Sequence, residues 1–466
     1  MKKFLPDLIA ILAFIILSFA YFFPADIEGR ILFQHDTAAG VGAGQESKEY
    51  LERTGERTRW TNSIFGGMPT YQMSPSYDST TSLKGVEKVY RLFLPDYVVL
   101  TFIMMLGFYI LLRAFGISAW LAGLGGVIWA FSSYFFILIP AGHIWKFVTL
   151  AYIPPTIAGV VLAYRKKYLL GGIVTALFIA LQIQSNHIQM SYYFMFVILF
   201  FVGAYFEDAY KKKELPHFFK ASGVLALAAV VGVCINISNL YHTYEYSKET
   251  MRGKSELKQE GAAASQTSSG LDRDYITNWS YGIGETLTLL VPNVKGGGSG
   301  STMSQSEAAM AKANPMYNGI YSQLPQYFGE QPWTAGPVYV GAFVMFLFVL
   351  GCFIVKGPLK WALLGATIFS ILLSWGKNFM GLTDFFIDYV PMYNKFRAVS
   401  SILVIAEFTI PLLAIFALKE ILSKPDMLKQ EKNCRGVIAA LVLTAGVALI
   451  LAVAPGTFFS SFITTQ

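Results

Sequence analysis

Two charged side chains that lie beside apolar runs have the chemistry of a group-transfer site. Asp36, in the segment Gln34–Thr37, follows an apolar run near the N-terminus. Its carboxylate could take a proton from an acceptor hydroxyl or bind a divalent cation such as Mg²⁺ or Mn²⁺. Arg397 precedes another apolar run, where a guanidinium could grip a phosphate, and Lys395 could share that task. Asp36 could instead be an ordinary loop aspartate or a helix N-cap, and Arg397 could be an interfacial arginine. Position alone leaves these interpretations open.

Further polar residues fall at short turns between apolar runs. His143 and Lys146 share one such turn, and His187 lies in another among glutamines and asparagines. These side chains could hydrogen-bond within their turns or contact a sugar or a lipid head group. Their spacing indicates no metal site, and the three cysteines lie far apart without a CxxC pair.

One carboxylate, Glu407, falls inside an apolar run. A charged residue in the middle of a membrane-spanning helix costs about 2.5–3.5 kcal/mol on insertion scales, so such a side chain faces a partner or a cavity. Two interpretations stay open. Glu407 makes a packing hydrogen bond between helices, or it tunes a site or carries protons.

The elements that position these residues follow from composition. Of the 466 residues 54% are hydrophobic and only 14% are charged, and the mean hydropathy is +0.49. Soluble domains carry roughly 25% charged residues, so a soluble enzyme, a nucleic-acid-binding domain and a disordered protein all fit poorly. A spanning helix needs about 20 apolar residues, and about eleven runs meet this length. We expect an all-α polytopic membrane protein.

The spans divide the chain into five parts. The first span is 1–23, six more lie in 97–241 and four in 336–466, while 24–96 and 242–335 are two long connections. With the N-terminus in the cytoplasm, the predicted inner segments hold about 17 Lys and Arg residues and the short outer ones about 4. Both long connections are then extracytoplasmic. The net charge of +7 is a topology signal of this kind and does not indicate a nucleic-acid partner.

The order of these parts resembles the GT-C superfamily of membrane glycosyltransferases, which has a single N-terminal span, a long outer loop with an acidic residue at its start, and then many helices. More narrowly, the chain is similar to the bacterial YfhO-like membrane proteins in the form found in Bacteroidetes. The segments that carry this resemblance extend over almost the whole chain: Gln34–Thr37, Arg59–Gln72, Gln184–Tyr193, Trp279–Asn293, Gln326–Ala342 and Tyr393–Ser400.

The resemblance implies an enzyme of the bacterial inner membrane. It would move a sugar from a polyprenyl-phosphate donor to a cell-envelope acceptor on the extracytoplasmic side, with the lipid bilayer as its surroundings. Asp36 matches the acid that serves the acceptor or a metal in such enzymes, and Arg397 with Lys395 matches the basic group that holds the lipid phosphate. Asp36 stands without an adjacent second acid, which leaves metal dependence open; Glu285 and Glu330 could supply the missing carboxylate. His35, beside Asp36, is a further candidate for substrate contact.

This layout predicts a cavity between the outer helix ends, roofed by the two long loops and lined by Asp36 and Arg397. A transporter or flippase for a lipid-linked saccharide is an alternative, with Glu407 central in place of Asp36. A non-catalytic envelope assembly factor that docks partners on its loops is another. The relatives continue past the last span, so we expect the chain to be part of a longer protein.

Overall fold

The computed structural model describes residues 4–73, 75–253 and 270–459. These residues are mostly helical, and the strands among them, β1 (Trp60–Thr61) and β2 (Met68–Pro69), form one short antiparallel pair. The chain forms two compact units, which we describe separately. The first comprises residues 4–130, 138–195 and 209–253, and the second comprises residues 131–137, 196–208 and 270–459.

The structure contains the apolar helices that an all-α polytopic membrane protein requires. Within the described residues six are long and apolar enough to cross a membrane: Leu5–Phe22 (α1), Ile144–Tyr164 (α7), Ile188–Lys211 (α9), Leu215–Ile235 (α10), Val399–Ser423 (η7 and α18) and Glu431–Val453 (α19 and α20). Two bent pairs raise this number to eight: Ala119–Ala130 with Ser133–Ala141 (α5 and α6, 48°) and Pro358–Ser374 with Gly376–Tyr389 (α16, then η5 and α17, 110°). Three shorter apolar helices are Val98–Ala114 (α4), Tyr168–Gln184 (α8) and Ala342–Ile354 (α15). Each of the eleven predicted runs overlaps one of these helices or bent pairs, of which six to eight are long and apolar enough to cross a membrane.

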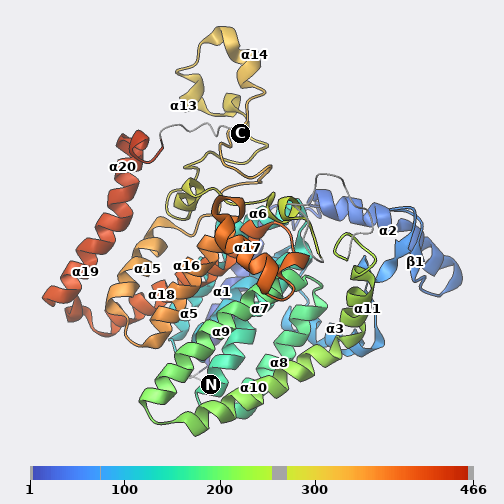
Figure 1. Cartoon of the computed structure of the whole chain (residues 1–466), viewed down its shortest axis with the longest axis horizontal. Coiled ribbons are helices and arrows are strands. Elements are labelled where there is room, and N and C mark those ends of the chain that lie inside the picture. The colour runs from blue at the N-terminus through green and yellow to red at the C-terminus, as the bar shows by residue number, and fades with distance from the viewer. Residues whose placement is uncertain (1–3, 74, 254–269, 460–466) are drawn as a thin grey trace. The chain divides into compact units, whose positions relative to one another are not determined.

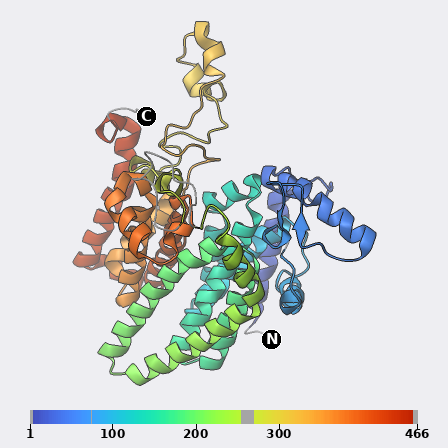
Figure 2. The same cartoon turned by 45° about the vertical axis from the view of Figure 1, so that its right-hand side comes forward.

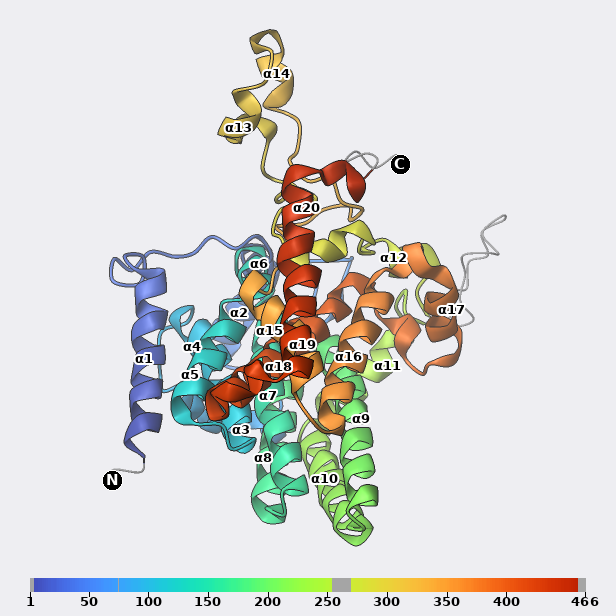
Figure 3. The same ribbon diagram turned by 90° about the vertical axis from the view of Figure 1, so that its left-hand side faces the viewer.

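In the first unit α7 is the central helix. It is apolar on all faces and nearly every residue of it is buried, as expected for a helix surrounded by others. It packs against α4 and α8, while α10 packs on α8 and α1 on α4 (Figures 1 and 3). Small residues allow the closest of these approaches: a Cβ on Gly159 would lie 2.6 Å from Thr175 N, and one on Gly171 would lie 2.5 Å from Ala163 N.

The first long connection contains a small folded piece. It consists of α2 (His35–Thr54), the β1–β2 hairpin, η1 (Thr70–Gln72) and α3 (Asp78–Tyr90). Glu46 of α2 ties the helix to the hairpin by accepting from Thr61 Oγ1 at 2.7 Å and from Asn62 N at 2.7 Å. Hydrogen bonds from Thr61 and Asn62 lower the pKa of Glu46, which keeps this tie charged.

Polar contacts also fix the C-terminal end of α3 to α7. Arg91 Nε donates to Tyr152 Oη of α7 at 3.1 Å, and Tyr152 Oη donates to Glu87 Oε1 at 2.8 Å. Farther along the chain, α10 stops at Ile235 and α11 (Ile237–Ser247) follows, so a helix continues into the predicted second loop. Asn236 marks the break, where its Nδ2 donates to the carbonyl of Ala180 at 3.0 Å.

In the second unit α18 is the buried helix. α15 and α16 pack on it, and α19 (Glu431–Leu441) packs on α15 before a π-helical turn and α20 (Val447–Val453). Figure 3 shows α19 and α20 as one long rod. Between residues 270 and 341 the chain forms short helices, of which α13 and α14, drawn in yellow in Figure 2, lie farthest from the α15–α18 packing. The short helices of this segment are α12 (Arg273–Thr277), η2 (Gly284–Leu289), η3 (Met303–Gln305), α13 (Glu307–Met310), η4 (Pro315–Tyr317) and α14 (Asn318–Tyr321).

Candidate functional site

Asp36 and His143 are in polar contact in the first unit. Asp36 lies in the first turn of α2, and its Oδ2 is 3.0 Å from Nε2 of His143, the N-cap residue of α7. His35 Nδ1 lies 3.4 Å from the other oxygen, Oδ1. The side chains of His143 and Asp36 are 48% and 55% exposed, so a reacting molecule can reach the carboxylate. An exposed pair of this kind contributes about 0–1 kcal/mol, and its main effect is to orient the carboxylate.

The backbone around the pair fits only with glycine at position 142. Gly142 has φ +80°, and a Cβ there would lie 2.8 Å from Thr37 N and 3.2 Å from Asp36 Cβ. This close approach brings the turn before α7 against the start of α2. A second tie comes from Gln34, whose Nε2 donates to the carbonyl of Ile139 at 2.7 Å.

Lys146 and His187 are further predicted residues of the first unit. Lys146 is in the first turn of α7, and His187 is in the turn between α8 and α9. Burial, followed by the positive charge of Lys146 and that of His143, lowers the pKa of His187 to about 3. His187 is therefore neutral at pH 7, and its Nδ1 is buried without a hydrogen-bond partner among the described residues. Of the predicted residues, His35 and His143 thus contact Asp36, while Lys146 and His143 lie within electrostatic reach of His187.

The ligand set for a cation at Asp36 is limited. Within the described ranges no group of three or more His, Cys, Asp and Glu side chains is arranged to hold a metal ion. A divalent cation at Asp36 would therefore need further ligands from water or a bound molecule.

Arg397 lies in an aromatic setting in the second unit. Its Nη1 donates to Tyr275 Oη at 2.7 Å, and its guanidinium lies 5.4 Å from the centre of the Tyr275 ring and 5.9 Å from that of Trp279. Arginine over aromatic faces keeps its planar donors pre-organised while its charge remains accessible. Arg397 is exposed, and Lys395, two residues earlier, is partly buried, which lowers the pKa of its ammonium.

The segment that carries Arg397 is fixed on both sides. Leu271 N donates to Asn394 O at 3.0 Å, and Ser400 N donates to Trp279 O at 3.0 Å. The short α12 that leads to Trp279 is in turn held by Arg273, which pairs with Asp384 and Asp388 of α17 at 3.0 and 2.5 Å. These contacts hold the segment that carries Arg397 through its neighbouring residues.

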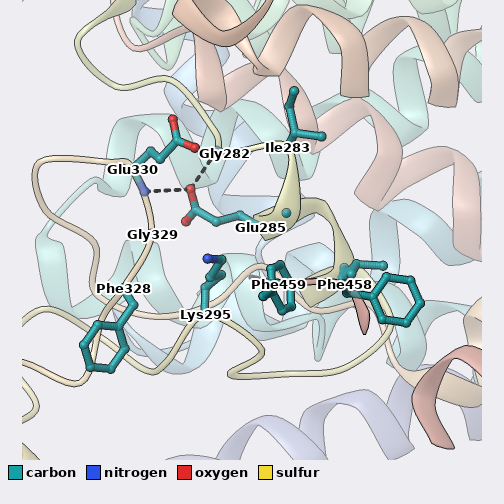
Figure 4. A pocket seen from close by; sticks show the side chains of 11 residues that line it. Gly282, Ile283, Glu285, Lys295, Phe328, Gly329, Glu330, Phe458 and Phe459 are labelled. Carbon is teal, nitrogen blue, oxygen red and sulfur yellow. Dashed lines mark hydrogen bonds between the residues drawn. The ribbon is translucent and has the colours of Figure 1, made fainter. Parts of the chain in front are cut away.

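Glu285 and Glu330 line a cavity of about 340 Å³ in the second unit, which we call the Glu285 pocket (Figure 4). Its other walls are Lys295, the rings of Phe328, Phe458 and Phe459, and glycine backbone. Lys295 Nζ lies 4.5 Å above the Phe459 ring. The pocket therefore combines carboxylates, an ammonium and aromatic faces, a mixture suited to a small polar ligand.

Glu285 itself is a structural acceptor. It is 2% exposed, and its carboxylate accepts from Gly282 N at 2.7 Å, Glu330 N at 3.0 Å and Tyr327 Oη at 2.5 Å. Three donors satisfy a buried carboxylate in its charged form. Burial, and then the charge of Glu285, raise the pKa of Tyr327, so this phenol stays protonated and remains a donor. The carboxylate thus joins the segments 282–285 and 327–330.

Glu407 is fully buried in the first turn of α18. Ser132 Oγ donates to its Oε2, while Oε1 has no hydrogen-bond partner in the described part of the chain. Ser132 lies in the two-residue break between α5 and α6. A packing hydrogen bond between elements, one of the two interpretations of Glu407, is therefore present.

Asp36 and Arg397 belong to different units. The common cavity expected for them accordingly stays a prediction, as do the catalytic and phosphate-binding roles assigned to them.

Sequence reasoning missed His242 and Arg59, which join Tyr71 and Tyr77 in an aromatic cluster of the first unit. The Tyr77 ring stacks on His242 at 5.6 Å with an interplanar angle of 9°, Tyr71 lies 5.4 Å from the same imidazole, and the Arg59 guanidinium lies 5.8 Å from the Tyr77 ring. Tyr71 and Tyr77 are partly buried and His242 is exposed. Accessible rings of this type suit contact with sugar rings or lipid head groups. The tyrosine-rich stretch Tyr241–Tyr246, directly after an apolar run, is the signal that could have revealed it.

Comparison of the chain with protein-family models, curated proteins and solved structures finds no match. Any functional assignment therefore depends on the arrangement of the residues described above and on the resemblance of the sequence motifs.

Proposed function

We propose that the protein is a GT-C-type glycosyltransferase with about eleven membrane spans and a cytoplasmic N-terminus. It moves a sugar from a polyprenyl phosphate to a cell-envelope acceptor on the extracytoplasmic face of a bacterial inner membrane. The observation that carries the proposal is the Asp36–His143 pair, an oriented and half-exposed carboxylate at the start of the buried apolar helix α7. A base beside a membrane-spanning helix suits a donor whose tail stays in lipid while its sugar meets a polar acceptor.

The proposed reaction is a displacement at the anomeric carbon of the donor sugar. The acceptor oxygen forms a bond to that carbon, Asp36 takes the hydroxyl proton, and the bond between the sugar and the phosphate oxygen breaks. The polyprenyl phosphate leaves with its electron pair, and the positive charges of Arg397 and Lys395 stabilise it. His143 holds the carboxylate of Asp36 in the orientation that accepts the proton.

The test measures transfer of radiolabelled sugar from a set of polyprenyl-phosphate donors into an envelope fraction, using the purified full chain. We expect transfer from at least one donor and a loss of about 10²–10⁴ in kcat for Asp36→Asn, the range of a general base. Glu52→Gln removes an exposed carboxylate from the same helix, α2, and should leave transfer unchanged. Equal activity of Asp36→Asn and the native chain would overturn the proposal.

The role of Arg397 is tested separately by binding. Native mass spectrometry of the chain with undecaprenyl phosphate should show a complex that Arg397→Gln weakens about tenfold or more and Arg397→Lys weakens less, because lysine keeps the charge but not the planar fork. Arg435→Gln is a matched control, since Arg435 is an exposed arginine paired with Glu431. Equal binding by all four proteins would remove Arg397 from the donor site.

The proposed orientation has its own test. A cysteine introduced at Glu52 should react with a membrane-impermeant maleimide added outside intact cells. One introduced at Lys212 should react only after the cells are opened, because positive segments stay in the cytoplasm. The reverse pattern would contradict the assigned face.

A second candidate function is a transporter for a lipid-linked saccharide. The two bent pairs, α5 with α6 and α16 with α17, favour it, because interrupted helices are typical of transporter binding sites. Flux of a lipid-linked saccharide across liposomes that Glu407→Gln abolishes and Asp36→Asn spares would support this function. Normal envelope assembly with Asp36→Asn, without flux or transfer, would instead support the assembly-factor alternative.

A further inference from the structure

We infer that α3 is a re-entrant helix, which enters one leaflet of the membrane beside α8 and presents an apolar side to the lipid chains. This leaflet is the one at the end of α7 that begins with Ile144. The partner is the lipid of that leaflet, with its acyl chains against the apolar side of α3 and its phosphate head groups at a basic side. All residues of the argument belong to the first unit. The inference requires that α7 spans the membrane, and it does not rest on sugar transfer.

The N-terminal end of α3 lies near the level at which α8 ends. Tyr77, the N-cap residue of α3, stacks on His242 of α11, with ring centres 5.6 Å apart and an angle of 9° between the rings. One turn earlier in α11, Asn239 Nδ2 donates to Asn186 Oδ1 at 3.0 Å. Asn186 belongs to the polar turn after Gln184, the last residue of α8. The first turn of α3 is therefore held close to this turn, and Figure 1 shows α3 beside α8 and α11.

The C-terminal end of α3 lies much deeper. Tyr90 packs against Tyr152 of α7 and Phe178 of α8, with ring centres 5.8 and 5.1 Å apart. The 21 residues of α7 extend about 32 Å, which matches a hydrocarbon core of roughly 30 Å. At 1.5 Å per residue, Tyr152 is about 12 Å along the axis from Ile144, and Phe178 is about 9 Å from Gln184. Side chains tilt toward the N-terminus of their helix, but α7 and α8 are antiparallel neighbours, so the two tilts offset each other and Tyr90 lies roughly 10 Å below the helix ends.

After α3 the chain reverses and returns to the surface. Leu92 and Phe93 have φ +51° and +54°, and Phe93 N donates to Lys88 O at 3.2 Å. Glycine or asparagine is the usual residue in this left-handed region, so two bulky apolar residues there indicate that their side chains have a use. Before α4 begins, Tyr97 Oη donates to Ala25 O at 3.2 Å, just beyond the end of α1. The segment from α3 to Tyr97 thus enters and leaves by the same face of the helices.

The deep part of this segment exposes apolar side chains. Val86 and Val89 of α3 are 43% and 61% exposed, and Leu92 and Phe93 in the reversal are 44% and 74% exposed. Two of them lie one turn apart on α3, and the other two follow directly. In water such a continuous apolar surface would be a liability, whereas at a depth of roughly 10 Å its surroundings are lipid chains. Lipid is therefore the occupant that fits this side of α3.

The charges of the segment fit the same placement. Arg91 Nη2 lies 2.5 Å from Glu87 Oε1, and both groups share Tyr152 Oη, so each charge at this depth has a partner, as charges inside a membrane require. Lys84 and Lys88 are exposed and lie one turn apart, on a different side of α3 from Val86 and Val89. Long lysine side chains beside an apolar stripe reach the phosphates of lipid head groups.

The experiment is electron paramagnetic resonance of nitroxide labels on the purified full chain, in nanodiscs of phosphatidylethanolamine and phosphatidylglycerol. The chain's own Cys234, Cys352 and Cys434 are first replaced by alanine. Val89→Cys or Phe93→Cys then provides the labelling site. We expect both labels to collide severalfold more often with molecular oxygen than with a polar nickel chelate, because oxygen dissolves in hydrocarbon and the chelate stays in water.

Two further labels are the controls. Glu52→Cys places a label on α2, where the native side chain is 64% exposed, and this label should favour the nickel chelate. Lys84→Cys places a label on the basic side of α3, and this label should meet both reagents at comparable rates, as expected at the level of the head groups.

Three results would overturn the inference. If the labels at 89 and 93 favour the chelate as strongly as the label at 52, α3 faces water. If both reagents are excluded from 89 and 93, protein covers this side, as it would with another part of the chain or a second copy. If the label at 84 behaves like the one at 89, the basic side lies in the hydrocarbon. Val86→Cys replaces either of the first two variants if that variant does not fold, because Val86 lies on the same side of α3 and is also exposed.

Discussion

His143 Nε2 lies 3.0 Å from Asp36 Oδ2, a contact that joins the start of α7 to the start of α2. Because both side chains are about half exposed, the pair adds only about 0–1 kcal/mol to stability. Its consequence is geometric: the imidazole limits rotation of the carboxylate, and the second oxygen remains near His35 at 3.4 Å. A proton acceptor needs this fixed orientation, since misplacement by about 1 Å can cost a hundredfold in rate.

The first prediction concerns His143→Ala. We expect kcat for sugar transfer to fall about ten- to hundredfold with little change in KM, because the carboxylate loses its orientation while the binding surface is kept. The measurement is steady-state kinetics with the best donor. His35→Ala is the matched control, since His35 is more exposed and farther from the carboxylate, and its effect should be smaller than threefold. Equal losses for the two variants would contradict an orienting role.

The second prediction concerns the glycine beside the pair. Gly142→Ala places a Cβ at φ +80° and 2.8 Å from Thr37 N, so we expect a loss of about 1–3 kcal/mol in the free energy of unfolding, together with loss of transfer. Gly44→Ala, in the helix α2 with no atom within 4 Å of the new Cβ, should instead stabilise by about 0.5–1 kcal/mol. Thermal unfolding in detergent separates the two. Similar effects at both positions would show that the close approach at Gly142 is unimportant.

Apolar runs and the charges between them predict much of this arrangement. Each predicted run overlaps an apolar helix or a bent pair because a run of about 20 apolar residues has few other solutions than a buried or membrane-spanning helix. The pairing of Asp36 with His143 could not be predicted, since it depends on the backbone of Gly142 and on the Gln34 amide bond to Ile139. Neither contact leaves a periodic signal in the sequence.

The role of Glu285 could not be predicted from the sequence either. The sequence singles it out as a carboxylate that could contact substrate, and in the structure its oxygens are taken up by Gly282, Tyr327 and Glu330. Residue type indicates that a carboxylate is present, but the number of donors around it is a property of tertiary structure. That number separates a structural acceptor from a group that is available to a ligand.

The third prediction concerns pH. The pKa of His187 is about 3 in the fold, against 6.5 for an ordinary histidine. Well above pH 6.5 the imidazole is neutral in both the folded and the unfolded chain, so it does not contribute to the pH dependence of the free energy of unfolding. As the pH falls from 6.5 toward 3, the unfolded chain binds a proton here and the folded chain does not, so stability falls over this window. The unfolding temperature of the native chain should therefore decrease more steeply below pH 6.5 than that of His187→Gln.

The control for this pH effect is His35→Gln. His35 is a strongly exposed histidine of the same unit, and its removal should leave the slope of the unfolding temperature against pH unchanged. Parallel curves for the native chain and His187→Gln would mean that the pKa of His187 is the same in the folded and unfolded chain, which would contradict its burial beside basic groups.

The fourth prediction concerns Glu285→Gln. A glutamine has the same shape, but its amide NH₂ would face at least one of the three donors that now point at the carboxylate, Gly282 N, Glu330 N and Tyr327 Oη. Loss of a buried, charge-assisted contact costs about 1–3 kcal/mol. Both backbone donors bond the same oxygen, Oε2, and the phenol bonds Oε1. We expect faster hydrogen exchange at the amides of Gly282 and Glu330, since the neutral amide oxygen is a weaker acceptor than the carboxylate.

Glu330→Gln is the matched variant for this test, because Glu330 lines the same pocket while it is its backbone N–H that bonds Glu285. Its side chain can change without loss of that bond, so exchange at Gly282 should stay slow. If both variants speed exchange equally, the pocket depends on total negative charge. If only Glu285→Gln does, the carboxylate acts as the acceptor that joins 282–285 to 327–330, and a ligand in the pocket must bind through the remaining groups, Glu330 and Lys295.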